Sequence, residues 1–78
     1  MAIEDVRDNV VQNLNYYIPH EFLNRLQLVG DRIFKNQYHA AWISNNLQDC
    51  IVVVLNDYQK ENSLITVLHY ELSMPKGV

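Results

Sequence analysis

The chain has 78 residues, which predicts a single domain over residues 1–78 with a core too small to be robust on its own. Cys50 is the only cysteine, which excludes an internal disulfide and is typical of a protein kept in a reducing compartment. Six basic against nine acidic residues give a net charge of −3, with the basic residues scattered, so no nucleic-acid partner is expected.

The apolar segments are short. The most apolar run, Cys50–Leu55, is far below the ~20 residues that span a bilayer, and the first residues carry acids where a secretion signal needs basic residues. We therefore expect a soluble, cytoplasmic protein without a membrane partner.

The first segment, residues 3–17, is predicted to be a helix. Its apolar residues recur every three or four positions, as one stripe of a helix requires: Ile3, Val6, Val10, Leu14 and Tyr17. Acidic residues in the first turns suit the positive end of the helix dipole. Pro19 ends the helix, because the residue before a proline is pushed out of the helical region.

Residues 19–29 are predicted to form a second helix. Pro19 would occupy its first position and Gly30 would lie just past its end, which is the usual asymmetry of helix termini. Phe22, Leu26 and Val29 would share one face. The alternative is a strand beginning near Arg25, which the apolar spacing does not exclude.

Residues 32–44 are predicted to form a third helix, with Asp31 as its N-cap. Helical spacing connects five apolar residues, Ile33, Phe34, Tyr38, Ala41 and Trp42. The alternation of Tyr38, Ala40 and Trp42 also permits a strand.

Residues 50–58 and 64–72 are predicted to form an antiparallel β-hairpin, because both runs are rich in β-branched residues and a short polar loop separates them. Residues 73–78 are expected to be a frayed tail. The predicted fold class is α+β, with three N-terminal helices packed on a C-terminal hairpin. The alternatives are one N-terminal helix with a larger antiparallel sheet, or an all-α fold.

The first strand of this hairpin is apolar on both faces, which three short helices would struggle to cover. We therefore expect a homodimer formed through the hairpin, with Ile51, Val53, Ile65 and Val67 in the interface. The alternative is a monomer whose helices enclose the hairpin.

No motif indicates catalysis or ligand binding. His20 and Glu21 are helix neighbours that point about 100° apart, so they would not face one reacting atom. Cys50 and the three histidines (His20, His39 and His69) lack the close ligand spacing of structural zinc sites. Two glycines cannot form a phosphate-binding loop. We expect no enzyme, metal, cofactor or small-molecule substrate.

Aromatic and arginine residues, which are enriched in binding hot spots, give the remaining functional signal. The candidate protein-binding residues are Tyr16, Arg25, Arg32, Trp42 and Tyr58. We expect a small adaptor or inhibitor that sterically occludes a protein partner, of the kind that bacteria and phages encode. The alternative is a structural subunit of a larger assembly, such as a virion or a secretion complex.

Overall fold

The computed structural model describes residues 2–61 and 63–72. Within them the chain forms two helices and four strands: α1 (Ile3–Leu14), α2 (His20–Leu23), β1 (Leu26–Phe34), β2 (Gln37–Ser44), β3 (Asp49–Asn56) and β4 (Ile65–Glu71). The strands form one antiparallel sheet in the order β1-β2-β3-β4, so each strand pairs with the next along the chain. The prediction of an α+β fold is confirmed.

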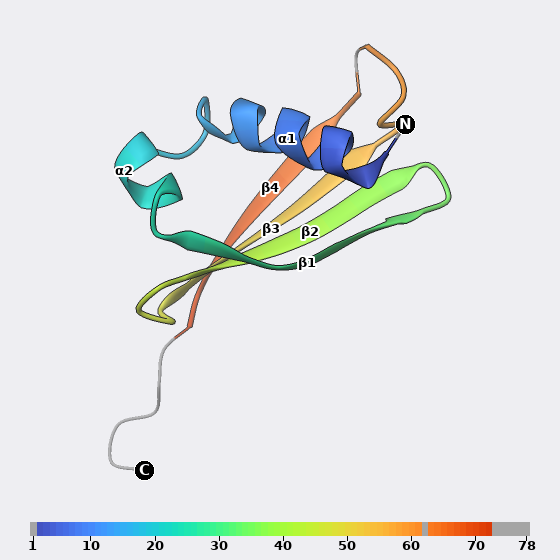
Figure 1. Ribbon diagram of the computed structural model, residues 1–78. Helices are drawn as coiled ribbons and strands as arrows, with labels where there is room; N and C mark the ends of the chain where they lie inside the picture. Colours follow the sequence, from blue (N-terminus) through green and yellow to red (C-terminus); the bar gives the residue numbers. More distant parts are fainter. Residues whose placement is uncertain (1, 62, 73–78) are drawn as a thin grey trace.

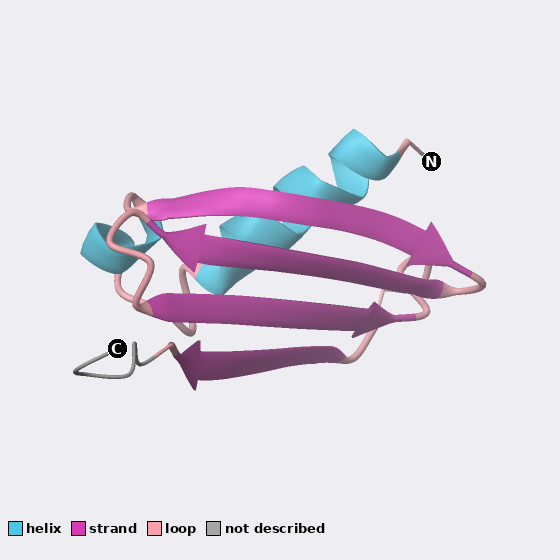
Figure 2. Ribbon diagram, turned by 90° about the horizontal axis from the view of Figure 1, so that it is seen from below, coloured by secondary structure: helices cyan, strands magenta, loops and turns pink. Residues whose placement is uncertain are grey.

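The molecule has two layers. Helix α1 lies across one face of the sheet (Figure 1), and a view from below has the four strands in front with the helices behind them (Figure 2). The core lies between α1 and the central strands: Val6, Val10, Leu14, Ile18, Tyr38, Ala40, Trp42, Ile51, Val53 and Leu55 are buried. We call the sheet surface under α1 the inner face and the opposite surface the open face.

The predicted first helix exists and ends at Leu14, three residues earlier than expected. Val6, Val10 and Leu14 form its buried stripe, as the spacing predicted. Tyr17 lies in the following turn and is exposed, whereas Ile18 returns to the core, where its main-chain N–H donates to Leu14 at 2.9 Å. The helical conformation is therefore lost between Leu14 and Pro19.

The prediction of a second helix over residues 19–29 was wrong beyond its first turn. Only His20–Leu23 is helical, and β1 begins at Leu26, close to the alternative start near Arg25. Gly30 does not end a helix: it pairs with Ala41 in the sheet, next to a register shift between Leu28 and Gly30. Pairing with β2 satisfies this backbone and overrides the weak local preference for helix.

The prediction of a third helix over residues 32–44 was also wrong. This segment holds the end of β1, a tight turn at Lys35 (φ 58°) and Asn36, and all of β2. Alternate residues of β2 are buried, from Tyr38 to Ser44, as the competing strand interpretation required. The apolar spacing that resembled a helix runs across the turn, so it joins residues of two strands.

The predicted C-terminal hairpin exists as β3 and β4, each slightly shorter than expected, but it is half of a larger sheet rather than a separate unit. The observed architecture matches the alternative of one N-terminal helix with a larger antiparallel sheet and excludes the all-α alternative. The tail predicted to be frayed, residues 73–78, lies outside the described residues.

Candidate functional site

The apolar run Cys50–Leu55 alternates between the two faces. Ile51, Val53 and Leu55 face α1 and are buried, with exposures of 2%, 0% and 5%. The side chains between them point to the open face, where the described chain places no second layer (Figure 2). Alternate residues of this run therefore complete the core, and the residues between them form a surface.

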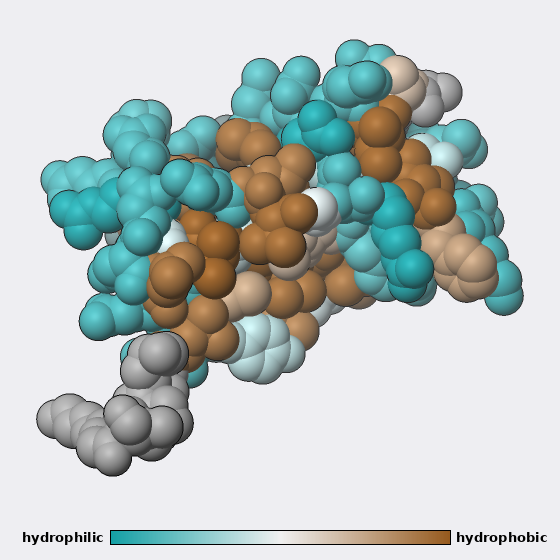
Figure 3. Space-filling view, turned by 60° about the horizontal axis from the view of Figure 1, so that its bottom comes forward, coloured by the Kyte–Doolittle hydropathy of each residue, from teal (hydrophilic) through white to brown (hydrophobic). Residues whose placement is uncertain are grey.

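The open face is apolar at its centre. In the register of the four strands it comprises Gln27, Gly30, Arg32, Phe34, Gln37, His39, Ala41, Ile43, Cys50, Val52, Val54, Asn56, Thr66, Leu68 and Tyr70. Seen from below, apolar side chains gather across this surface with hydrophilic ones around them (Figure 3). Leu68 and Tyr70 remain 42% and 51% exposed. A contiguous apolar surface of this kind is typical of interaction sites.

Charge divides unevenly between the two faces. The strand carboxylates occupy inner-face positions. Asp31 pairs with Ala40 of β2, and Asp49 of β3 pairs with Glu71 of β4. The open face as defined above carries Arg32 and His39 and no acidic residue. With histidine counted as neutral, Arg32 is therefore the one formal charge on this face, in a chain whose net charge is −3.

The basic end of the open face is organised around Phe34. The guanidinium of Arg32 lies 5.9 Å from the centre of its ring, and the Lys35 ammonium lies 5.5 Å away. Both distances allow cation–π attraction, which holds the two cations beside one exposed ring. Next to this group, a shallow cavity of about 290 Å³ lies over Gly30, Ala41 and Val52, where two of the three side chains are small or absent.

The two edges of the sheet differ in how they are protected. The irregular register at Leu28–Gly30 bends β1, and such bulges discourage edge pairing. Edge strand β4, Ile65–Glu71, contains no Pro, Gly or Lys, and no described strand pairs with its outer side. Its free backbone groups therefore remain available for strand addition.

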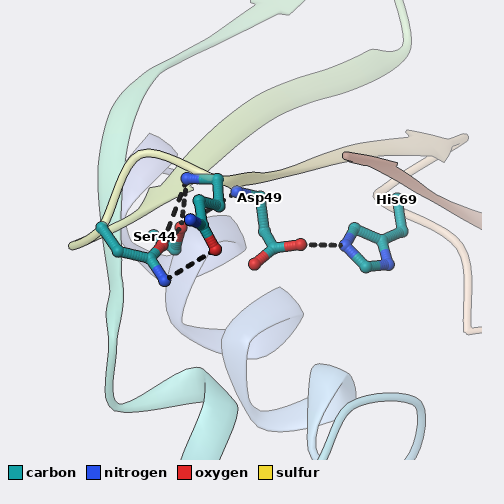
Figure 4. A network of polar contacts seen from close by, with 5 residues as sticks. Ser44, Asp49 and His69 are labelled. Atoms are coloured by element: carbon teal, nitrogen blue, oxygen red, sulfur yellow. Dashed lines mark hydrogen bonds and ion pairs between the residues drawn. The ribbon is translucent and has the colours of Figure 1, made fainter. Parts of the chain in front are cut away.

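A polar network fixes the turn between β2 and β3 and reaches β4 (Figure 4). The Ser44 hydroxyl donates to Asn46 at 2.6 Å and accepts the main-chain N–H of Asp49 at 3.0 Å. The Asp49 carboxylate lies 2.9 Å from Nε2 of His69. Ser44, Asp49 and His69 are not a nucleophilic triad, because the hydroxyl is buried and bonds the turn, whereas Nε2 of His69 contacts the Asp49 carboxylate and not the hydroxyl.

A second network joins α1 to β1. Nε and Nη2 of Arg7 donate to the two oxygens of Asp31 at 2.7 and 3.0 Å, and the Tyr38 hydroxyl donates to Asp31 Oδ2 at 2.9 Å. The guanidinium holds the pKa of the Asp31 carboxyl below its usual range. Burial, followed by the bond to Asp31, raises the pKa of Tyr38 above its usual value. All three groups are occupied with one another, so this network positions the helix.

The candidate protein-binding residues do not form one site. Tyr16 is 85% exposed and lines a groove with the half-buried Tyr58 between α1 and the β3–β4 loop. Arg32 lies on the open face, and Arg25 is exposed in the turn before β1. Trp42 is 6% exposed and belongs to the core, so its side chain is not available to a partner.

The candidate dimer residues all lie on the inner face. Ile51 and Val53 are enclosed by the chain's own helix, and Ile65 and Val67 are partly buried beside them. The residues of β3 that have no layer above them are their sequence neighbours Val52 and Val54. The sequence did not single out Val52 and Val54, because the two alternating sets of residues in Cys50–Leu55 are equally apolar. Dimerisation itself stays a prediction.

Among the described residues, no cluster of three His, Cys, Asp or Glu side chains could hold a metal ion. Neither described helix is long and apolar enough to cross a membrane. Comparisons of the chain with protein-family models, with curated proteins and with solved structures found no match.

Proposed function

We propose that this chain acts by binding another protein through the open face of its sheet, and that it occludes a working surface of that partner. The proposal is carried by the contrast within β3, whose inner residues are buried under α1 while Val52 and Val54 are only partly buried and have no second layer above them in the described chain. Burying a valine or leucine side chain on such a face contributes roughly 1.5–3 kcal/mol, which gives the partner a reason to bind.

Charge defines the chemistry of the partner. Arg32 and His39 border the apolar centre, and the open face offers no carboxylate. A matching surface therefore has an apolar centre flanked by Asp or Glu side chains. A second copy of the chain is the less complementary occupant, because its own open face could not supply an acidic group opposite Arg32.

The size of the face predicts a reversible complex. Four strands ~4.8 Å apart, seven to nine residues long at ~3.3 Å per residue, present a flat area of roughly 500 Å². Stable complexes bury about 800 Å² on each partner. The face alone therefore supports a transient complex, unless the partner also contacts the rim or an edge.

A photo-crosslinking experiment tests this proposal. The photoreactive residue p-benzoylphenylalanine replaces Val52 on the open face or, as a matched control, Gln12 on the exposed side of α1. In cells that naturally contain the protein, we expect a discrete protein adduct from position 52 only, several-fold weaker after Arg32→Glu. Equal labelling from both positions contradicts the proposal. An adduct of twice 9.2 kDa identifies a second copy as the occupant and overturns the heterologous partner.

The second candidate function is that of a structural subunit, and the bare outer edge of β4 favours it. Copies or neighbouring subunits would add strands to this edge by main-chain hydrogen bonding. Light scattering over a range of concentrations checks this alternative. Growth beyond a dimer supports it, whereas a constant mass of 9.2 kDa contradicts it.

A further inference from the structure

A pocket of about 390 Å³ lies on the helix side of the molecule, away from the open face. Its walls are Tyr17, Ile18, Pro19 and Phe22 from the segment that follows α1, and Ile51 and Val67 from the inner face of the sheet. The volume falls at the lower end of the range of small-molecule sites. The hollow exists because α1 ends at Leu14, so only the single turn of α2 extends over this end of β3 and β4.

His69 is the one strongly polar side chain in this lining, and its ring is held in place from two sides. Nε2 lies 2.9 Å from Asp49 Oδ1, and the ring of Phe22 meets the imidazole edge-on at 5.9 Å. Asp49 is in turn fixed by the hydrogen bond from its main-chain N–H to Ser44. The imidazole is therefore oriented before any ligand arrives.

This orientation decides what the pocket can recognise. A carboxylate only accepts hydrogen bonds, so in the neutral imidazole the proton resides on Nε2 and faces Asp49. Nδ1 then carries the free lone pair, no described residue donates a hydrogen bond to it, and the side chain is 48% exposed, so a ligand would replace solvent there. A hydrogen-bond donor on a ligand would satisfy this acceptor.

We propose that the pocket binds a small aromatic molecule of one or two rings that carries a hydroxyl group, with the hydroxyl donating to Nδ1 of His69. Aromatic walls favour an aromatic body, since Tyr17 and Phe22 can meet a ring edge-on or offset. The apolar floor of Ile51 and Val67 removes the rest of the ligand from water. This site is independent of the protein-binding function proposed for the open face, and it adds a ligand class that the sequence did not predict.

Two probes with the same naphthalene ring system test the proposal in NMR titrations of the ¹⁵N-labelled chain. 2-Naphthol has the hydroxyl donor, and 2-methoxynaphthalene lacks it. We expect saturable shifts of the amide signals of Tyr17, Phe22, Val67 and His69, with 2-naphthol binding about three- to tenfold more tightly, as one hydrogen bond allows. The Nδ1 resonance of His69 should move with 2-naphthol alone.

Two substitutions separate the donor from the apolar pocket. His69→Phe removes the acceptor and keeps a ring, so both probes should bind equally. Val67→Trp fills the pocket and should abolish binding of both. Equal affinity of the two probes for the unmodified chain overturns the proposal without any variant. Shifts that concentrate on Val52 and Leu68, or that never saturate, also overturn it, because they place the probes on the open face or nowhere.

Discussion

The two faces of this sheet are built from the same strands and similar residues, yet they have different roles. On the inner face, Val53 is fully buried and packs among the residues that contact α1. On the open face, the neighbouring Val52 lies between Ala41 and Leu68 with no layer above it. Helix α1, and not the apolar character of the strands, therefore decides which residues hold the fold together.

A substitution that adds a charge should give the largest difference in stability between the two faces. Val53→Asp places a carboxylate in a fully enclosed site, at a cost above about 4 kcal/mol, which approaches the whole stability expected of a small domain. Val52→Asp places its carboxylate at a partly buried position that water still reaches, and it should cost about 1 kcal/mol through lower strand preference. Circular dichroism at 25 °C should find the first variant unfolded and the second folded.

These two variants also connect the fold to the proposed function. A folded Val52→Asp chain that carries the photoreactive residue at Leu68, on the same face, should give no partner adduct, because the new acid faces a partner surface that is itself expected to be acidic. If Val52→Asp unfolded as completely as Val53→Asp, the open face would be part of the core, and the contrast between the faces would be mistaken.

The fold was predictable where one pattern dominates a segment. Three buried residues at helical spacing, Val6, Val10 and Leu14, gave α1, and two β-branched runs gave the β3–β4 hairpin. Residues 26–44 fit both the apolar spacing of a helix and the alternation of a strand. The turn at Lys35 and Asn36 holds no glycine or proline to mark it, and Lys35 adopts a left-handed φ of 58° without either signal. Only pairing with β3 resolves this segment as strands.

The candidate surface was predictable in kind but not in position. Cys50–Leu55 indicated that some apolar surface would lack cover, and the open face is such a surface. To predict whether Val52 or Val53 lies on the uncovered face, one must know which face α1 covers, and no local feature of the strand indicates this. The pocket beside His69 was unpredictable for a related reason, since Phe22, Asp49 and His69 meet only after the sheet forms.

The ion pair between α1 and β1 explains part of why the helix covers the inner face, and a change of pH should expose its contribution. The native pKa of Asp31 is lowered, so its stabilising effect is complete above the unfolded value of about 4 and is lost as pH falls through the native pKa. Asp31→Asn should lower the melting temperature by several degrees at pH 7. The difference from the unmodified chain should shrink in acid, as thermal unfolding between pH 2 and 7 will measure.

Exposed carboxylates offer the control for this prediction. Asp8→Asn changes an exposed residue of α1 and should leave both the melting temperature and its pH dependence nearly unchanged. An Asp31→Asn variant with the same acid response as the unmodified chain would mean that the Arg7–Asp31 pair does not hold the helix.

The finest comparison uses one substitution at two adjacent residues of β2. Ala40 is 4% exposed in the core under α1, whereas Ala41 borders the shallow cavity of the open face. Ala40→Val adds two methyl groups to a closed space and should destabilise the fold by about 1 kcal/mol, because α1 must shift to admit them. Ala41→Val adds the same groups where space is free, and a β-branched residue suits a strand, so stability should hold or rise by a few tenths of a kcal/mol. Urea unfolding midpoints measure both changes. Equal losses at the two positions would mean that the open face is as tightly packed as the core, and a surface without free space could not receive the partner proposed for it.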